Sequence, residues 1–303
     1  MKSIRKFLNL SRPILITGET GTGKSHLAKK LFNHSNIFKE KFLTVHLASI
    51  KEDLIESELF GHKKGSFTGA IENKVGYLKA AENGTLFLDE IGELSLEAQK
   101  KLLYVLEEGR FVPVGDTSAI KVNCRMILAT NKNLEEMVRN KTFREDLFYR
   151  INQFSIELKP LREKEEKLNI IQNNLEKEAN KVGKKLFYTD EVLSFFTKYY
   201  FKGNYRELKN ITEYLVHFCE EDKIHIKDLP ENLSSEMSEQ MNYKKMISYK
   251  EALKQFETNY LESMLRLNNG KINDTALKIG ISKSALIYKI KNYNIDHYHI
   301  KSK

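Results

Sequence analysis

Short apolar runs alternate with amphipathic stretches through the first half of the chain. Four of these runs are predicted to be buried strands: residues 13–17, 42–47, 85–88 and 126–129. The stretch from 96 to 108 has helical periodicity, with four leucines predicted on one face: Leu96, Leu102, Leu103 and Leu106. Strands that alternate with helices in this way predict an α/β fold, in which crossover helices cover a parallel sheet.

Beyond Pro160 the pattern becomes helical. Three segments are predicted to be helices with no strand between them: residues 164–182, 189–200 and 205–219. A polar stretch from 230 to 242 is typical of a linker, and a last helical group covers 248–294. The predicted organisation is an α/β core at 1–158, a helical lid at 159–233, a linker at 234–247 and a small all-α module at 248–303.

The composition is that of a soluble globular protein. Hydrophobic residues are 41% of the 303 and charged residues 30%, and no apolar run approaches the roughly 18 residues that span a bilayer. The N-terminal segment lacks a long apolar stretch, so we predict no signal peptide. Cys124 and Cys219 have no metal-ligand spacing and are predicted to be free thiols in a reducing compartment. We therefore expect a cytoplasmic protein with no membrane partner.

Positive charge is concentrated at the C-terminal end. The chain carries a net charge of +9, and residues 271–303 hold seven lysines against two aspartates, a net charge of +5. A basic tail is also compatible with a merely solvated surface. Because this one coincides with a helical motif, we predict contact with a polyanion.

A glycine-rich loop follows the first predicted strand and precedes a helical pattern at 26–31. Its eight residues match the phosphate-binding loop, whose backbone N–H groups surround phosphate oxygens at the positive end of a helix. Lys24 is expected at the β- and γ-phosphates and the Ser25 hydroxyl on Mg²⁺. The alternative is a chance glycine-rich turn, which the strand-to-helix context disfavours. The residues predicted to bind ATP are Gly18, Glu19, Thr20, Gly21, Thr22, Gly23, Lys24 and Ser25.

Two further predicted strands end in polar residues. The strand at 85–88 leads into Asp89, expected to bind the Mg²⁺ of the nucleotide, and Glu90, expected to orient and deprotonate a water. The strand at 126–129 leads into Thr130 and Asn131, at the strand end where open α/β sheets bind ligands. Each pair alone is equally compatible with a strand-terminating turn. Downstream of a phosphate-binding loop, they predict a site of ATP hydrolysis.

At this point the sequence resembles a known family. Residues 56–62 (ESELFGH) and the following GSFTGA at 65–70 resemble the segment with the GAFTGA signature of bacterial enhancer-binding proteins, the AAA+ ATPases that activate sigma-54 RNA polymerase. Ser66 replaces the usual alanine. The resemblance covers about residues 13–230. It implies an AAA+ parallel sheet with a helical lid, an ATPase coupled to transcription initiation, and a homo-oligomer between a dimer and a hexameric ring.

The signature segment is predicted to be a projecting loop. Its flanking glycines make it flexible, and Phe67 offers an apolar tip of the kind that engages a partner. The alternative is a hydrophobic turn packed against its own domain. By resemblance the partner is the sigma-54 RNA polymerase holoenzyme, contacted by Gly65, Ser66, Phe67, Thr68, Gly69 and Ala70.

The resemblance also implies roles for three arginines. Residues 143–150 (FREDLFYR) resemble the segment that carries arginine fingers, which implies that Arg144 and Arg150 reach the γ-phosphate in a neighbouring subunit. Residues 158–163 resemble the connection into the lid. Residues 203–210 (GNYRELKN) resemble the second sensor, which makes Arg206 the lid arginine that contacts ATP in cis. Spacing alone is equally compatible with surface ion pairs.

Besides Ser66, four residues depart from the family pattern. Ser25 stands where glutamate is common, and residues 201–202 (FK) replace the usual Trp-Pro. His46 stands where an asparagine usually holds the catalytic glutamate until the partner engages. Histidine also hydrogen-bonds carboxylates, with a different geometry and pH dependence. How His46 affects the coupling of hydrolysis to sigma-54 contact is left open.

The C-terminal module is predicted to be a helix-turn-helix. A long helix from 248 to 267 is ended by the Asn-Gly pair at 269–270, and two short helices follow, with Gly280 in the turn and Ser282 capping the second. The pattern resembles the Fis-type DNA-binding domain, which implies contact with double-stranded enhancer DNA. A helical hairpin for protein contact is the alternative. The long first helix suggests a dimer that pairs half-sites about 34 Å apart.

Five residues on or near the second short helix are candidates for DNA contact. Base edges are assigned to Lys283 and Ser284, and phosphates to Lys289 and Lys291, with Tyr288 beside them.

The leading hypothesis is thus a sigma-54-dependent activator that uses ATP hydrolysis in a ring to remodel the closed promoter complex. The alternative is a DNA-binding regulator whose ATPase core is weakly coupled or structural, which the presence of Phe67, Thr68, Asp89 and Glu90 disfavours. An AAA+ unfoldase is a third reading, and the signature loop together with a helix-turn-helix argues against it.

Overall fold

A computed structural model describes residues 5–231, 233, 248–268, 270–293 and 295 of the chain. The contacts divide the chain into two compact units, Met1–Pro230 and Glu231–Lys303. Each unit is described by itself. The predicted linker at 234–247 lies outside the described residues.

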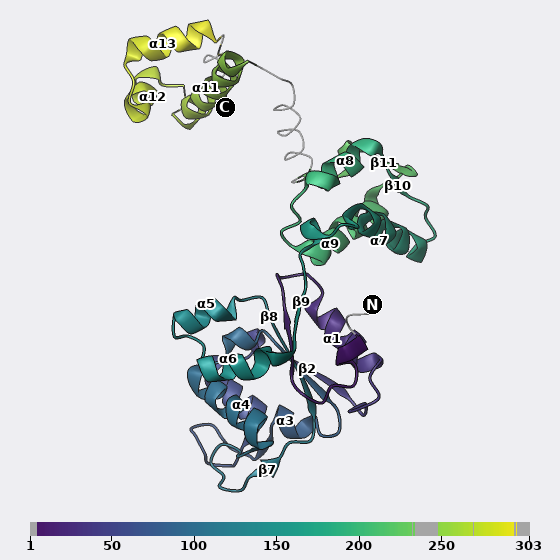
Figure 1. The fold of residues 1–303 in the computed structure, drawn as a ribbon. Coiled ribbons are helices and arrows are strands. Elements are labelled where there is room, and N and C mark those ends of the chain that lie inside the picture. The colour runs from purple at the N-terminus through teal and green to yellow at the C-terminus, as the bar shows by residue number, and fades with distance from the viewer. Residues whose placement is uncertain (1–4, 232, 234–247, 269, 294, 296–303) are drawn as a thin grey trace. The chain divides into compact units, whose positions relative to one another are not determined.

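A five-stranded parallel sheet forms the centre of the first unit (Figure 1). Its strand order is β2-β5-β8-β1-β9, and every neighbouring pair is parallel. The α/β prediction is therefore confirmed. The strands are β1 (Ile14–Thr17), β2 (Phe42–His46), β5 (Thr85–Asp89), β8 (Arg125–Thr130) and β9 (Ser155–Glu157).

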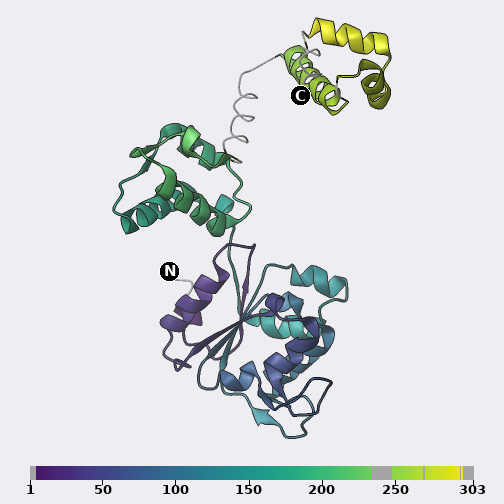
Figure 2. The same ribbon diagram turned by 180° about the vertical axis from the view of Figure 1, so that it is seen from behind.

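Helices cover both faces of this sheet, as the opposite views in Figures 1 and 2 show. Ile14 and Ile16 of β1 pack with helix α1 (Lys24–Asn33), whereas Leu15, between them, belongs to the core on the other face. That second core contains residues of α2 (Glu52–Phe60) and α4 (Leu96–Glu108). The alternation follows from the pleat of a strand, in which successive side chains point to opposite faces.

Two expectations about the core are wrong in detail. Only Val45 of β2 is fully buried, because β2 lies at the edge of the sheet. In α4, Leu102, Leu103 and Leu106 are buried, but Leu96 is 47% exposed in the first turn of the helix. The helix itself has the predicted bounds, with the Ser95 hydroxyl capping its first turn and Gly109 ending it at a φ of 66°.

Shorter elements surround the sheet. Two antiparallel ribbons pair β3 with β4 and β6 with β7. Cys124 and Cys219 are free thiols, as predicted. The remaining elements of this region are β3 (Gly61–His62), β4 (Lys74–Val75), α3 (Tyr77–Ala80), β6 (Arg110–Phe111), β7 (Ile120–Lys121), α5 (Leu134–Arg139) and α6 (Glu145–Ile151).

The rest of the first unit, which we call the lid, is mainly helical. It comprises α7 (Lys167–Lys181), α8 (Asp190–Lys198) and α9 (Asn204–Phe218), around a core that includes Ile171, Phe196 and Leu215. The expectation of no strand here is wrong. Residues Phe187–Tyr188 (β10) and Lys223–Ile224 (β11) form a short parallel pair.

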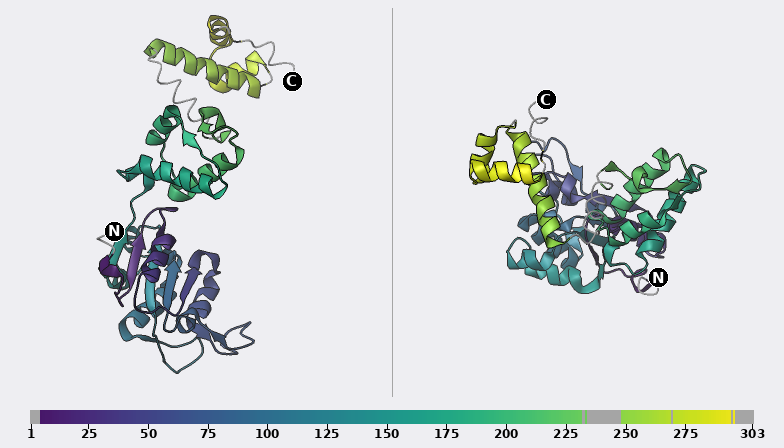
Figure 3. Two further views of the ribbon diagram at one scale, coloured as in Figure 1. Left: turned by 90° about the vertical axis from the view of Figure 1, so that its right-hand side faces the viewer. Right: turned by 90° about the horizontal axis from the view of Figure 1, so that it is seen from above.

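Among its described residues from 248 onward, the second unit has the helices α11 (Tyr249–Leu267), α12 (Ile272–Ile279) and α13 (Lys283–Asn292) (Figure 3). Gly280 has a φ of 73° in the turn, and the Ser282 hydroxyl accepts from the N–H of Ala285, both as predicted. Helix α11 ends at Leu267, before the predicted Asn-Gly pair, with Asn268 at its C-cap. None of the helices that the structure describes is both long and apolar enough to cross a membrane.

Candidate functional site

The five parallel strands end at one edge of the sheet, and the predicted phosphate loop begins there, directly after β1. The loop turns through Gly18, Gly21 and Gly23, whose φ values are all positive. No side chain of the described residues caps the first turn of α1, and the first bond into the helix runs from the N–H of Leu27 to the carbonyl of Gly23. The N–H groups of that turn are therefore available to an anion at the positive end of the helix.

Lys24 is the cation of this loop and is only 7% exposed. Its ammonium donates to the carbonyl oxygens of Gly18 at 3.0 Å and Glu19 at 3.4 Å. Burial lowers the pKa of Lys24, and the nearby carboxylates of Glu90 and Asp89 oppose that shift. A buried ammonium between carbonyls and carboxylates is poised for a stronger anionic partner such as phosphate.

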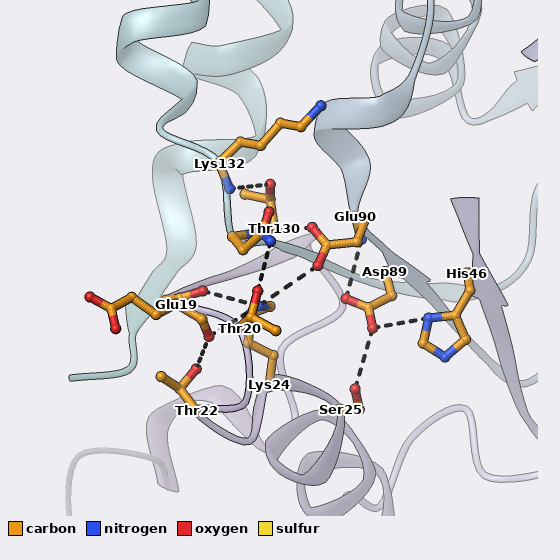
Figure 4. A network of polar contacts seen from close by, with 12 residues as sticks. Glu19, Thr20, Thr22, Lys24, Ser25, His46, Asp89, Glu90, Thr130 and Lys132 are labelled. Carbon is orange, nitrogen blue, oxygen red and sulfur yellow. Dashed lines mark hydrogen bonds and ion pairs between the residues drawn. The ribbon is translucent and has the colours of Figure 1, made fainter. Parts of the chain in front are cut away.

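Asp89 ends β5 beside the start of α1. Its Oδ2 accepts from the Ser25 hydroxyl at 3.3 Å and lies 3.2 Å from Nδ1 of His46, its register partner on β2 (Figure 4). Carboxylate and hydroxyl oxygens are the ligands that Mg²⁺ takes beside phosphates. The residues present therefore fit a nucleotide-bound Mg²⁺ held by Ser25 and Asp89.

Glu90 follows Asp89 in a left-handed backbone conformation, with φ 61° and ψ 53°. Few residues other than glycine adopt it, and such strain is concentrated at functional sites. The turn places Oε2 where it accepts from the N–H of Asn131 at 3.2 Å, and Oε1 3.9 Å from the Lys24 ammonium. The Asn131 amide also donates to Thr20 at 2.9 Å. The three sequence motifs therefore meet in one site.

Thr130 is placed differently from its neighbour. Its side chain is fully buried, and its hydroxyl accepts from the N–H of Lys132 at 3.0 Å. This contact shapes the turn after β8. Thr130 thus supports the position of Asn131 in this structure.

The lid contacts the phosphate loop directly. The N–H of Tyr205 donates to the carbonyl of Gly21 at 3.0 Å, and a Cβ added at Gly21 would meet the Gly203 carbonyl oxygen at 2.1 Å. Arg206, one residue further on, is close enough to contribute to the lowered pKa of Lys24. The first turn of α9 therefore lies against the phosphate loop, with Arg206 near Lys24.

A second link between loop and lid was missed by the sequence reasoning. Glu19 forms a two-pronged ion pair with Arg162, one bond being 2.7 Å, and accepts from the Asn204 amide at 3.2 Å. The guanidinium also stacks on the Tyr200 ring at 4.3 Å. The glutamate lies 143 positions from Arg162. The sequence holds one local sign of this ion pair. Glu19 is an anion inside a loop predicted to bind anionic phosphate, so its charge needs a nearby cation.

Replacing Glu19 by glutamine should lower the melting temperature by about 2 °C at neutral pH, since a partly exposed ion pair contributes about 1 kcal/mol or less. Hydrogen bonds from Arg162 hold the pKa of Glu19 at about 2, below its ordinary 4.5. Stability from a depressed carboxyl pKa is fully present above pH 4.5 and is lost as the pH falls toward 2. Melting curves of both proteins from neutral to acidic pH measure it.

Glu163→Gln is the matched control, because Glu163 lies 3.6 Å from the same guanidinium and is more exposed. Its melting temperature should stay near that of the wild type. A Glu19→Gln deficit that persists unchanged into the acidic range would contradict the assignment.

The two predicted arginine fingers have different surroundings. Arg144 lies at the N-cap of α6, 37% exposed, and pairs with Asp146 at 2.7 Å. Arg150 is turned inward, where its Nη2 donates to the carbonyl of Leu106 at the end of α4, at 2.8 Å. Arg144 is therefore the one available at the surface, whereas Arg150 holds α4.

The signature segment connects β3 to β4. Phe67, Thr68 and the flanking Gly65 and Gly69 are exposed, and the Phe67 ring packs edge-on against His62 with centroids 4.9 Å apart. Ala70 is buried, and the Ser66 hydroxyl is buried with no hydrogen-bond partner among the described residues. The exposed tip is thus narrower than the six-residue segment predicted from the sequence.

A second loop, which includes residues 114–116, contacts the signature segment. The N–H of Lys63 donates to the carbonyl of Val114, and the Lys63 ammonium pairs with Asp116 at 3.2 Å. Gly115 packs against Ser66, where a Cβ would come within 2.4 Å. These contacts attach the base of the signature segment to the loop at 114–116.

In the second unit, the candidate DNA-binding residues do not all face solvent. Ser284, Tyr288 and Lys291 are exposed at helical spacing on α13, and Lys283 is exposed in its first turn. Lys289 instead donates to Glu257 of α11 at 2.6 Å, and Tyr293 donates to the same carboxylate. The structure thus exposes four of the five on α13 and pairs the fifth, which is partly exposed, with α11.

Comparison with known proteins places three matches along the chain. Residues 1–157 match the Sigma-54 interaction domain, 162–245 the AAA+ ATPase lid domain, and 252–293 the Bacterial regulatory protein, Fis family. The chain is 39% identical over 289 residues to regulatory protein AtoC of Escherichia coli (strain K12), covering 93% of this chain and 63% of AtoC. It is 36% identical over 309 residues to the transcriptional regulator NtrC of the same organism, covering 93% of this chain and 65% of NtrC.

One shorter relative and one solved structure are also similar to most of the chain. An uncharacterized protein in the HyuA 5' region of Pseudomonas sp. (strain NS671) is 41% identical over 260 residues, with 84% of this chain and 88% of that protein covered. The crystal structure of NtrX from Brucella abortus with ADP superposes with a TM-score of 0.72 at 29% identity, over 97% of this chain and 67% of NtrX. The chain thus spans about two thirds or less of AtoC, NtrC and NtrX. Together, the matched domains and these relatives show that the chain belongs to the family of sigma-54-dependent transcriptional activators, with an AAA+ core and lid and a Fis-type helix-turn-helix.

Proposed function

We propose that this protein binds enhancer DNA and uses ATP hydrolysis in a homo-oligomeric ring to remodel the closed complex of sigma-54 RNA polymerase in the bacterial cytoplasm. The observation that carries the proposal is the meeting of Lys24, Glu90 and Asn131 at the carboxyl edge of the sheet. NtrX, a relative of similar fold, has been solved with ATP and with ADP, which supports a nucleotide at this edge.

The arrangement of these groups accounts for hydrolysis. The N-terminus of α1 and Lys24 would bind the β- and γ-phosphates and stabilise the negative charge that develops on them. Glu90, held by the Asn131 N–H, would orient a water in line with the γ-phosphorus and take its proton. The Mg²⁺ held by Ser25 and Asp89 would neutralise phosphate charge. The products are ADP and inorganic phosphate.

Two further surfaces belong to the proposal. The exposed tip of Phe67 and Thr68 would contact sigma-54, and Arg144 would reach the nucleotide of a neighbouring subunit, with Arg206 acting in cis. The apolar side chains of Tyr249, Phe256 and Tyr260 remain exposed on α11, which supports pairing of two C-terminal modules.

The different surroundings of Lys291 and Lys289 lead us to expect different effects of the two lysines on DNA binding. Lys291→Ala should weaken binding to enhancer DNA and reduce the slope of log K against log salt by about one, since one phosphate contact is lost. Lys289→Ala should change that slope less, because its ammonium is held by Glu257. Fluorescence anisotropy titrations over a range of salt concentrations measure both slopes. Equal losses for the two variants would contradict this division.

The proposed function is tested by promoter opening. The purified protein, enhancer DNA, ATP and sigma-54 holoenzyme should produce unpaired promoter thymines detectable by permanganate, and a non-hydrolysable ATP analogue should not. A protein that hydrolyses ATP and binds the enhancer but never opens a sigma-54 promoter would instead be the DNA-binding regulator with an uncoupled core.

A further inference from the structure

A histidine stands beside the two oxygen ligands of the candidate cation site. His46 ends β2 and is the register partner of Asp89 on β5, so adjacent strand ends carry both side chains. Nδ1 of His46 lies 3.2 Å from Oδ2 of Asp89, and the Ser25 hydroxyl lies 3.3 Å from the same oxygen. Figure 4 shows the imidazole and the hydroxyl approaching this carboxylate from two sides.

These spacings are hydrogen-bond distances, and they also fit three atoms that bind one metal ion. Neighbouring ligands of an octahedral cation bound at about 2.1 Å are about 3.0 Å apart. The contacts of Oδ2 with Nδ1 and with the hydroxyl are both close to that separation. The imidazole is 58% exposed, so more than half of its surface is open to solvent and to a bound cation.

Glu90 does not compete for this histidine. Its carboxylate is engaged by the Asn131 N–H and lies near Lys24. His46, at the end of β2, therefore contacts Asp89, the carboxylate proposed to bind the metal. Glu90, the proposed base, contacts Asn131 and Lys24 instead.

The protein supplies only part of a coordination sphere. In the part of the chain that the structure describes, no group of three or more His, Cys, Asp and Glu side chains is arranged to hold a metal alone. The remaining ligands must come from nucleotide phosphates and water, as they do for a cation carried by ATP or ADP.

We propose that His46 is a nitrogen ligand of the nucleotide-bound divalent cation, so that its imidazole strengthens the binding of imidazole-binding metals at this site more than it strengthens the binding of Mg²⁺. The inference rests on the proposed nucleotide site and adds a third protein ligand to it. Neutral imidazole is a good ligand for Co²⁺, Ni²⁺ and Zn²⁺, and affinity rises from Mn²⁺ to Ni²⁺. Mg²⁺ prefers oxygen, so the imidazole adds little to its binding.

The direct test is spectroscopic. Pulsed electron paramagnetic resonance of the wild-type protein with Mn²⁺ and ADP should show coupling of the manganese to a directly bonded nitrogen. His46→Asn, which offers an amide oxygen instead, should lose this coupling while still binding Mn²⁺-ADP. His217→Asn, an exposed histidine of α9 far along the chain, is the matched control and should retain it.

A binding measurement provides the second readout. His46→Asn should weaken ADP binding about tenfold in Co²⁺ and leave it within about twofold in Mg²⁺. Wild-type protein that binds Mn²⁺-ADP without nitrogen coupling would overturn the inference and leave the nucleotide site intact, with His46 a hydrogen-bond donor to Asp89. Failure to bind any metal–ADP complex would overturn the proposed nucleotide site, and the inference with it.

Discussion

Replacing Glu90 by glutamine should lower kcat for ATP hydrolysis by about 100-fold or more while leaving the dissociation constant for ATP within about threefold. The amide can still accept from the Asn131 N–H, so the local structure should persist. It cannot take the proton of the attacking water, and the step that depends on a base is lost. Steady-state phosphate release and equilibrium binding of a fluorescent ATP analogue measure the two quantities.

Glu93→Gln is the matched control for this prediction. Glu93 lies three residues further along the same turn and pairs with Lys132 at 2.8 Å, away from the phosphate loop. Its turnover should be close to that of the wild type. Undiminished turnover in Glu90→Gln would remove Glu90 from its role as base.

Arg144→Ala should lower hydrolysis by about a thousandfold or more in the assembled ring while each subunit still binds ATP. Arg144 is exposed at the start of α6 and pairs only with the neighbouring Asp146 among the bonds that the structure describes for its side chain. None of these bonds joins Arg144 to the phosphate loop of its own subunit, so we expect its effect on hydrolysis to act across a subunit interface.

Mixing two inactive variants tests this directly. In a mixed ring, an Arg144→Ala subunit keeps Glu90 and receives the arginine of a Glu90→Gln neighbour, so part of the activity should return. Neither variant alone should show it. A mixture as inactive as its components, or full activity of Arg144→Ala, would contradict action in trans. Arg139→Ala, an exposed arginine of α5, is the control and should hydrolyse ATP normally.

Much of the fold could be predicted because its signals are local. Four of the five strands of the sheet and helix α4 each carry their own hydrophobic pattern, and the glycine turn of the helix-turn-helix is visible in the sequence. Strands β9, β10 and β11 were missed because two or three residues cannot display a period. The exposure of β2 was missed because strand order, which places it at the edge, is a property of the whole sheet.

The site was predictable as a set of residues but not as a set of contacts. Lys24, Asp89 and Glu90 come from motifs with known spacing, and the structure brings them together. The partners of Glu19, Lys289 and Arg150 are Arg162, Glu257 and the carbonyl of Leu106, which lie tens of positions or more away along the chain. No local pattern indicates such pairs, since they depend on how the elements pack.

These pairings change what the candidate site residues are expected to do. Arg150 holds the end of α4 and Lys289 holds α11, so Arg144 and Lys291 become the better candidates for contact outside the chain. Within the loop at 65–70, burial of Ala70 and of the Ser66 hydroxyl leaves Phe67 and Thr68 as the exposed tip.

The central claim is that ATP hydrolysis acts on sigma-54 through this tip, and Thr68→Ala tests it most directly. Thr68 is exposed and distant in sequence from every group that we propose to bind nucleotide, so the variant should fold and should hydrolyse ATP within about twofold of the wild-type rate. Open complexes at a sigma-54 promoter, measured beside ATP hydrolysis in the same reaction, should fall at least about tenfold. Promoter opening at the wild-type level by Thr68→Ala would contradict the claim.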